Sequence, residues 1–231
     1  MSNQFFCYLI VFSLALSSIC YELILAQSLS AFLENTVLRY SVTIGLYMCS
    51  LGIGALFAGE KWTRKSVINL LKIEIGLTMI GGFSVAMLFL TDALNVGRMG
   101  FLIMSHALII AIGFLSGFEI PLLVRMAGFY QQSPVNQVLA INYAGAFCGT
   151  VLFAFYLYPH VGLLPAAFLI GIVNAVSGLF LYFEEKQVET TDLKVFYSIL
   201  YLLVFLFLIL SLCVIYGDSI NSFFIHQYLS K

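Results

Sequence analysis

Long apolar runs alternate with short polar segments along the whole chain. A helix needs about 20 predominantly apolar residues to cross the hydrocarbon core of a bilayer. Stretches of about this length or longer lie at residues 5–33, 41–59, 67–91, 99–126, 135–158, 162–183 and 195–216. Because they are uniformly apolar, they lack the alternation of membrane β-strands. The pattern therefore predicts an all-α fold, a polytopic transmembrane helix bundle of about seven spans.

The polar segments between the runs are short. They leave room for one transmembrane domain over residues 1–216 and a short amphipathic tail over residues 217–231, which we expect to lie along the interface. The first run lacks a preceding Lys or Arg and is too long for a cleaved leader, so it is interpreted as the first span.

Composition supports the same class. Hydrophobic residues make up 62% of the 231 positions and charged residues 9%, whereas soluble domains are roughly half apolar and about a quarter charged. The net charge of −1 gives no reason to expect a nucleic-acid partner. We therefore expect lipid to be the main surrounding.

Lysine and arginine near the span ends predict the orientation. With seven spans, six of these residues fall on the side of the N-terminus and three on the other. The first group is Lys61, Arg64, Lys65, Arg125, Lys186 and Lys194, and the second is Arg39, Arg98 and Lys231. Since cytoplasmic loops carry the excess of positive charge, we expect a cytoplasmic N-terminus and an outer C-terminus. The expected location is the bacterial inner (plasma) membrane.

Two stretches about a hundred residues apart look alike. Tyr21-Glu22-Leu23 lies in the first predicted span and Phe118-Glu119-Ile120 in the fourth, and both following spans carry glycines. This predicts a 3+3 inverted repeat plus one added helix, an arrangement common in transporters. The alternative is that apolar helices with glycines resemble one another by composition alone.

Acidic residues inside predicted spans are the strongest chemical signal. A carboxylate at a helix centre costs about 2.5–3.5 kcal/mol on insertion scales, yet Glu22, Glu74 and Glu119 lie in spans, Glu74 near a span end. One hypothesis is an acidic, aromatic cavity that binds an organic cation. Its candidate ligand-binding residues are Tyr21, Glu22, Glu119, Arg125, Asn142 and Tyr143. The other hypothesis is that the acids are protonated or serve as hydrogen-bond partners between helices.

Other site signatures are missing from the sequence. The three histidines lie far apart, and no Walker loop, Ser–His–Asp order or glycine-rich dinucleotide turn occurs. We therefore expect no catalytic residues, no metal site and no cofactor on this chain.

Four motifs follow one another in a familiar order. They are Tyr21-Glu22-Leu23-Ile24-Leu25, Ser41-Val42-Thr43-Ile44-Gly45-Leu46-Tyr47, Gly117-Phe118-Glu119-Ile120-Pro121-Leu122-Leu123 and Asn142-Tyr143-Ala144-Gly145-Ala146. Together they resemble the N-terminal membrane region of membrane-bound polyamine aminopropyltransferases. These spermidine-synthase-like proteins join a transporter-like half to a synthase domain. The resemblance covers most of residues 15–185, and Asn142 replaces the acid of the family pattern Asp-Tyr-x-Gly-Ala.

The resemblance implies a membrane module of the spermidine-synthase-like family. Since the family's soluble synthase domain would follow the last helix, we expect no enzyme activity on this chain alone. The chain would act as a membrane anchor, or as a subunit that assembles with a partner protein. The alternatives are a small carrier or receptor for an organic cation such as a polyamine, and a subunit that completes an enzyme site with its partner.

Overall fold

The computed structural model describes residues 2–217 and is all-α over this range. Its α-helices are α1 (Ser2–Leu33), α2 (Thr36–Phe57), α3 (Glu60–Thr63), α4 (Ser66–Gly82), α5 (Ser84–Ala93), α6 (Gly97–Ala127), α7 (Val135–Leu152), α8 (Leu163–Phe180) and α9 (Leu193–Ile215). The other helical segments are the π-helix η1 (Phe153–Val161) and the 3-10 helices η2 (Leu181–Gln187) and η3 (Thr190–Asp192). The all-α prediction is confirmed. Apart from Gly217, the predicted amphipathic tail, which includes Lys231, lies outside the described residues.

The number of membrane-length helices agrees with the hydropathy pattern. Within residues 2–217, 6 helices are long and apolar enough to cross a bilayer, or 7 if α4 and α5 count as one bent span. The predicted run at 67–91 is this pair, which bends by 41°. Gly81 and Gly82 precede the bend, and the Ser84 hydroxyl donates to the Gly81 carbonyl at 2.7 Å. Glycine and serine are common at helix kinks because they weaken the helical hydrogen-bond ladder.

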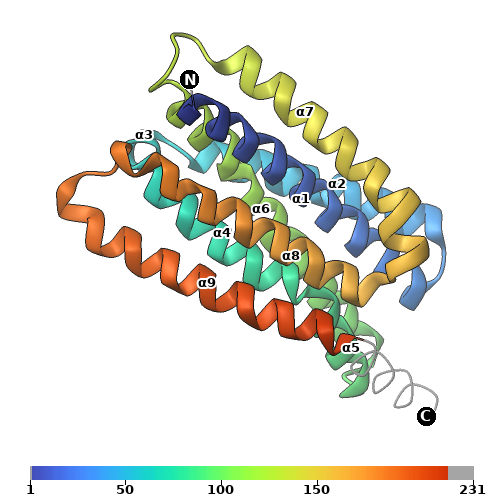
Figure 1. Cartoon of the computed structure of the whole chain (residues 1–231). Helices are drawn as coiled ribbons and strands as arrows, with labels where there is room; N and C mark the ends of the chain where they lie inside the picture. Colours follow the sequence, from blue (N-terminus) through green and yellow to red (C-terminus); the bar gives the residue numbers. More distant parts are fainter. Residues whose placement is uncertain (1, 218–231) are drawn as a thin grey trace.

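The helices form an inner and an outer group. More than half of the residues in the apolar windows of α1, α6 and α8 are buried, against about a fifth in α2, α7 and α9. In Figure 1, α7 and α9 lie along opposite edges of the bundle, with α1, α6, α4 and α8 between them. The core is built mainly from aliphatic side chains, together with Tyr21, Tyr47 and phenylalanines such as Phe168 and Phe196.

Helix pairing follows the pattern that an inverted repeat requires. The most extensive packing joins α2 to α6 and α1 to α7, and α4 packs on α6 as α8 does on α1. When α1, α2 and α4 are matched with α6, α7 and α8, the α2–α6 pair corresponds to the α7–α1 pair, and the α4–α6 pair corresponds to the α8–α1 pair. Glycine allows both leading contacts, because a Cβ on Gly117 would lie 2.2 Å from the Leu51 carbonyl oxygen and one on Gly145 would lie 2.3 Å from that of Phe12.

The two ends of the bundle differ in charge. The N-terminus lies at the same end as α3, the α6–α7 connection and the α8–α9 connection (Figure 1). All six basic residues of the larger predicted group belong to these segments or adjoin them. We call this the basic end.

Candidate functional site: an acidic cluster inside the bundle

Four acidic side chains are buried in the described part of the chain. Glu184 of η2 lies at the basic end, where Tyr130 and Gln187 donate to its carboxylate. The other three lie inside the bundle, one from each of α1, α4 and α6. Glu22, Glu74 and Glu119 are 4%, 0% and 4% exposed. Over the part of the chain that the structure describes, no lysine, arginine or histidine is among the buried residues. The interior is therefore acidic, without a buried basic partner.

Glu74 links α4 to α8. The side-chain amide of Asn174 donates to Glu74 Oε2 at 2.9 Å, to the Glu74 carbonyl at 3.2 Å and to Thr78 Oγ1 at 3.1 Å. Glu74 Oε1 and Asn174 Oδ1 are buried without a hydrogen-bond partner. Each of these two side chains therefore uses one polar atom in the contact, and each has a second polar atom that is open to another group.

Tyr21 lies beside the acids and also has an open polar atom. Its ring covers Gly81, where a Cβ would lie 2.6 Å from Tyr21 Cζ. Tyr21 directly precedes Glu22 on α1, and its hydroxyl and Glu119 Oε1 are both buried without a partner. Buried polar atoms in proteins are nearly always hydrogen-bonded to protein, water or a ligand. This concentration of open atoms marks a candidate binding site.

Tyr47 connects the other side of the cluster. Its hydroxyl lies 2.7 Å from Ser18 Oγ and donates to Ser116 Oγ at 3.1 Å, joining α2 to α1 and α6. Glu22 follows Ser18 and Glu119 follows Ser116 by about one helical turn, so both acids lie near the Tyr47 hydroxyl.

The structure brings together only some of the residues predicted from sequence. Tyr21, Glu22 and Glu119 lie in the interior, whereas Tyr143 is 69% exposed on α7. Since Gly145 and Gly149 face α1, Tyr143, two residues before Gly145, points to the opposite side of its helix.

The other two candidates lie elsewhere as well. Asn142 is half-buried on α7, and Arg125 is exposed in the last turn of α6. Asn142, Tyr143 and Arg125 thus do not line a common cavity with the interior acids, and a ligand-binding role for them stays a prediction.

Sequence reasoning gave too little weight to Glu74 and did not select Asn174. Glu74 was placed near the end of one continuous span, but in the structure it lies in the middle of α4, because the span breaks at Phe83. A usable signal was present: Asn174 is one of the few polar residues of its apolar run.

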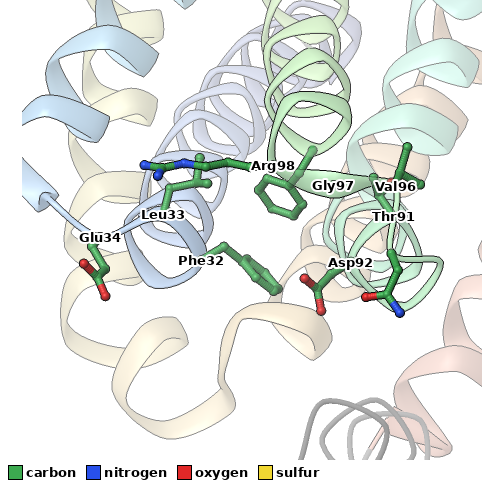
Figure 2. A pocket seen from close by; sticks show the side chains of 10 residues that line it. Phe32, Leu33, Glu34, Thr91, Asp92, Val96, Gly97 and Arg98 are labelled. Carbon is green, nitrogen blue, oxygen red and sulfur yellow. The ribbon is translucent and has the colours of Figure 1, made fainter. Parts of the chain in front are cut away.

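A hollow of about 420 Å³ lies at the end of the bundle opposite the basic end. It lies between the α1–α2 turn and the start of α6, and Figure 2 shows Glu34, Asp92 and Arg98 around Phe32. The rings of Phe32 and Phe101 are 5.0 Å apart. Two acids and one base give this hollow a net charge of −1. The hollow lies at the end of α1, the helix that carries Glu22, and is therefore a second acidic region on that helix.

Over residues 2–217, no group of three or more His, Cys, Asp or Glu side chains is arranged to hold a metal ion. The expected absence of a metal or cofactor stays a prediction.

The fold and the site define a class of protein: an all-α bundle of membrane-length helices with an acidic interior. Comparison with curated proteins then points to particular homologues. A polyamine aminopropyltransferase of Oceanobacillus iheyensis is 35% identical over 189 residues, which cover 78% of this chain and 36% of the relative. One from Leptospira interrogans is 34% identical over 72% of this chain and 33% of its own length. Polyamine aminopropyltransferase 1 of Streptomyces coelicolor is 33% identical over 76% and 33%.

These homologues agree with the resemblance found in the motifs. The chain spans about a third of the length of the curated relatives it matches. No family model matches the chain, and no solved structure matches it significantly.

One expectation is corrected by the comparison. The sequence led us to expect that this chain is not an enzyme on its own. Relatives that are 33–35% identical over most of the chain are named for an enzyme activity, which contradicts that expectation. The error arose because the end of this sequence, before any synthase domain, was taken as evidence about activity.

Proposed function

We propose that the bundle is the membrane-embedded part of a polyamine aminopropyltransferase, and that its interior acids bind an organic cation of the polyamine class. The observation that carries the proposal is the burial of three carboxyl groups from three helices with no buried base among the described residues. The names of the relatives, which specify polyamines, support the choice of cation.

Placement in a membrane is part of the proposal. Large apolar side chains cover the outward faces, including Leu56, Phe155 and Tyr201, which are 84%, 76% and 74% exposed. Lipid solvates such a surface, whereas water does not. The location proposed is the bacterial inner membrane, with the basic end in the cytoplasm.

The chemistry of a polyamine suits the interior cluster. A polyamine carries several ammonium groups along a flexible aliphatic chain, and each ammonium offers hydrogen-bond donors and a positive charge. Glu22 and Glu119 near the Tyr47 hydroxyl are suited to two such groups, and the open oxygens of Glu74 and Tyr21 offer further acceptors. Tyrosine rings add cation–π attraction. A charge buried without a partner is strongly unfavourable, so ligand and acids stabilise one another.

Aminopropyl transfer is proposed for the enzyme as a whole, to which the bundle contributes cation binding and attachment to the membrane. A protein partner that assembles with the bundle stays part of this proposal.

Equilibrium binding of labelled spermidine tests the proposal. The chain is reconstituted in lipid nanodiscs, and Glu22→Gln and Glu119→Gln are compared with Glu60→Gln, a control at an exposed position of the basic end. We expect each interior variant to weaken binding about tenfold or more, because each removes one partner of a desolvated charge pair. The control should bind like the unaltered chain. Equal binding by all four proteins, or no binding by the unaltered chain, would refute the proposal.

A further inference from the structure

Three basic side chains from separate elements line one pocket at the basic end. Arg64 precedes α4, Arg125 lies in the last turn of α6, and Lys186 lies in η2. The pocket has a volume of about 450 Å³ and is also lined by Ser66 and Glu189. With three bases and one acid, its net charge is +2. We call it the basic pocket.

The three bases are available to a ligand. Within the part of the chain that the structure describes, a salt bridge joins Lys65 to Asp192. Arg64, Arg125 and Lys186 have no carboxylate partner in this part of the chain. The hydrogen bond with Asp192 raises the pKa of Lys65, so this neighbouring base is already engaged. The unpaired bases lie on three different segments, and they therefore surround a common volume instead of forming a stripe along one helix.

The start of α4 adds a second, independent feature. Ser66, its first residue, lines the basic pocket, and the preceding Lys65 makes no side-chain capping bond. The first amide groups of an uncapped helix lack partners and carry a partial positive charge. A smaller adjoining pocket shares Arg64 and Glu189 with the basic pocket and reaches Val67 and Ile68 in this first turn. Backbone donors thus line the same region as the side-chain bases.

We propose that the basic pocket binds a phosphate group, and that the occupant is the headgroup of an anionic phospholipid. Arginine binds phosphate oxygens through two parallel hydrogen bonds, and helix N-termini are established phosphate sites. This inference rests on the proposed membrane location, since it places the pocket at the cytoplasmic headgroup level. Trp62, which is 36% exposed at the same end, is of the residue type enriched at membrane interfaces.

The basic pocket and the acidic cluster bind ligands of opposite sign. A polyamine is repelled by the three bases, and an anionic headgroup is repelled by the interior carboxylates. The inner leaflet carries the anionic lipids that attract basic segments, so the two sites have separate ligands and can be tested separately on one preparation.

Retention of lipid by the purified chain tests the inference. The chain is extracted in mild detergent and exposed to an equal mixture of phosphatidylglycerol and phosphatidylcholine, and bound lipid is measured by native mass spectrometry. We expect selective retention of phosphatidylglycerol, reduced about tenfold or more in Arg64→Gln/Arg125→Gln. Arg98→Gln, at the opposite end, is the matched control and should retain the lipid. Equal retention of both lipids, or retention unchanged in the double variant, would overturn the inference.

Two further arms define the ligand and protect against misfolding. Inorganic phosphate is added as a competitor: failure to displace the lipid supports a lipid headgroup, and full displacement at low concentration overturns that choice of source. Lys186→Gln, a milder change, should reduce retention part of the way. Spermidine binding is measured on the same samples, and it should be unchanged in Lys186→Gln. Loss of spermidine binding by every protein, with lipid selectivity intact, would refute the proposed function and leave this inference standing.

Discussion

At the scale of single residues, the amide of Asn174 is the clearest polar contact between two inner helices. It donates to Glu74 and Thr78 on α4 from its position on α8. Replacing it with leucine removes these donors and leaves Glu74 with no hydrogen bond from α8. We expect Asn174→Leu to destabilise the chain by about 1–2 kcal/mol, in the range of hydrogen bonds between membrane helices.

The measurement is the thermal unfolding midpoint in detergent. Asn142→Leu is the matched control, because this half-buried amide on α7 makes no hydrogen bond in the described part of the chain. We expect its midpoint to stay close to that of the unaltered chain. A midpoint as high in Asn174→Leu as in the control would show that the contact contributes nothing.

Sequence alone predicted the residue types of the site better than their partners. The insertion penalty on a charged residue identified Glu22 and Glu119, because it applies wherever a helix spans lipid. The direction in which a residue faces depends on which neighbour its helix packs against. The α7 face that contacts α1 is set by Gly145 and Gly149. Because the sequence does not specify which helix these glycines meet, it does not show that Tyr143 faces away from the interior.

At the scale of helices, close glycine contacts decide which helices are neighbours. A Cβ on Gly117 would lie 2.2 Å from the Leu51 carbonyl and 2.8 Å from the Ala55 amide nitrogen, whereas one on Gly45 would meet nothing within 4 Å. Backbone atoms cannot move aside as a flexible side chain can. We therefore expect Gly117→Ala to separate α2 from α6, and Gly45→Ala to be tolerated.

Disulfide trapping provides the measurement. Cysteines at Leu51 and Phe114, on α2 and α6, are oxidised in membranes of each variant after the native cysteines have been replaced. Cross-linking should fall several-fold in Gly117→Ala and stay unchanged in Gly45→Ala. Undiminished cross-linking in Gly117→Ala would contradict the packing described here.

Helix existence was predictable and helix continuity was not. Six membrane-length helices follow from apolar length alone, since any run of about 20 apolar residues satisfies the bilayer. The bend between α4 and α5 depends on Gly81, Gly82 and Ser84, and glycine is frequent in unbroken membrane helices as well. For this reason the run at 67–91 was predicted as one straight span, and Glu74 was placed near its end.

At the scale of the whole molecule, the basic end should face the cytoplasm. This orientation follows from the excess of Lys and Arg at that end. We expect a single cysteine at Lys61 to react with an impermeant maleimide in inverted vesicles, and one at Asn95 to react in intact cells. The reverse pattern would place the basic end outside and remove the basis for a cytoplasmic headgroup in the basic pocket.

The central claim is that the buried acids of this bundle bind an organic cation. A ligand that binds only the folded state raises its thermal stability in proportion to occupancy. The most direct measurement is therefore the unfolding midpoint of the reconstituted chain with and without spermidine, compared with Glu22→Gln/Glu119→Gln. We expect spermidine to raise the midpoint of the unaltered chain and to leave that of the double variant unchanged. An equal rise in both proteins, or no rise in the unaltered chain, would contradict the claim.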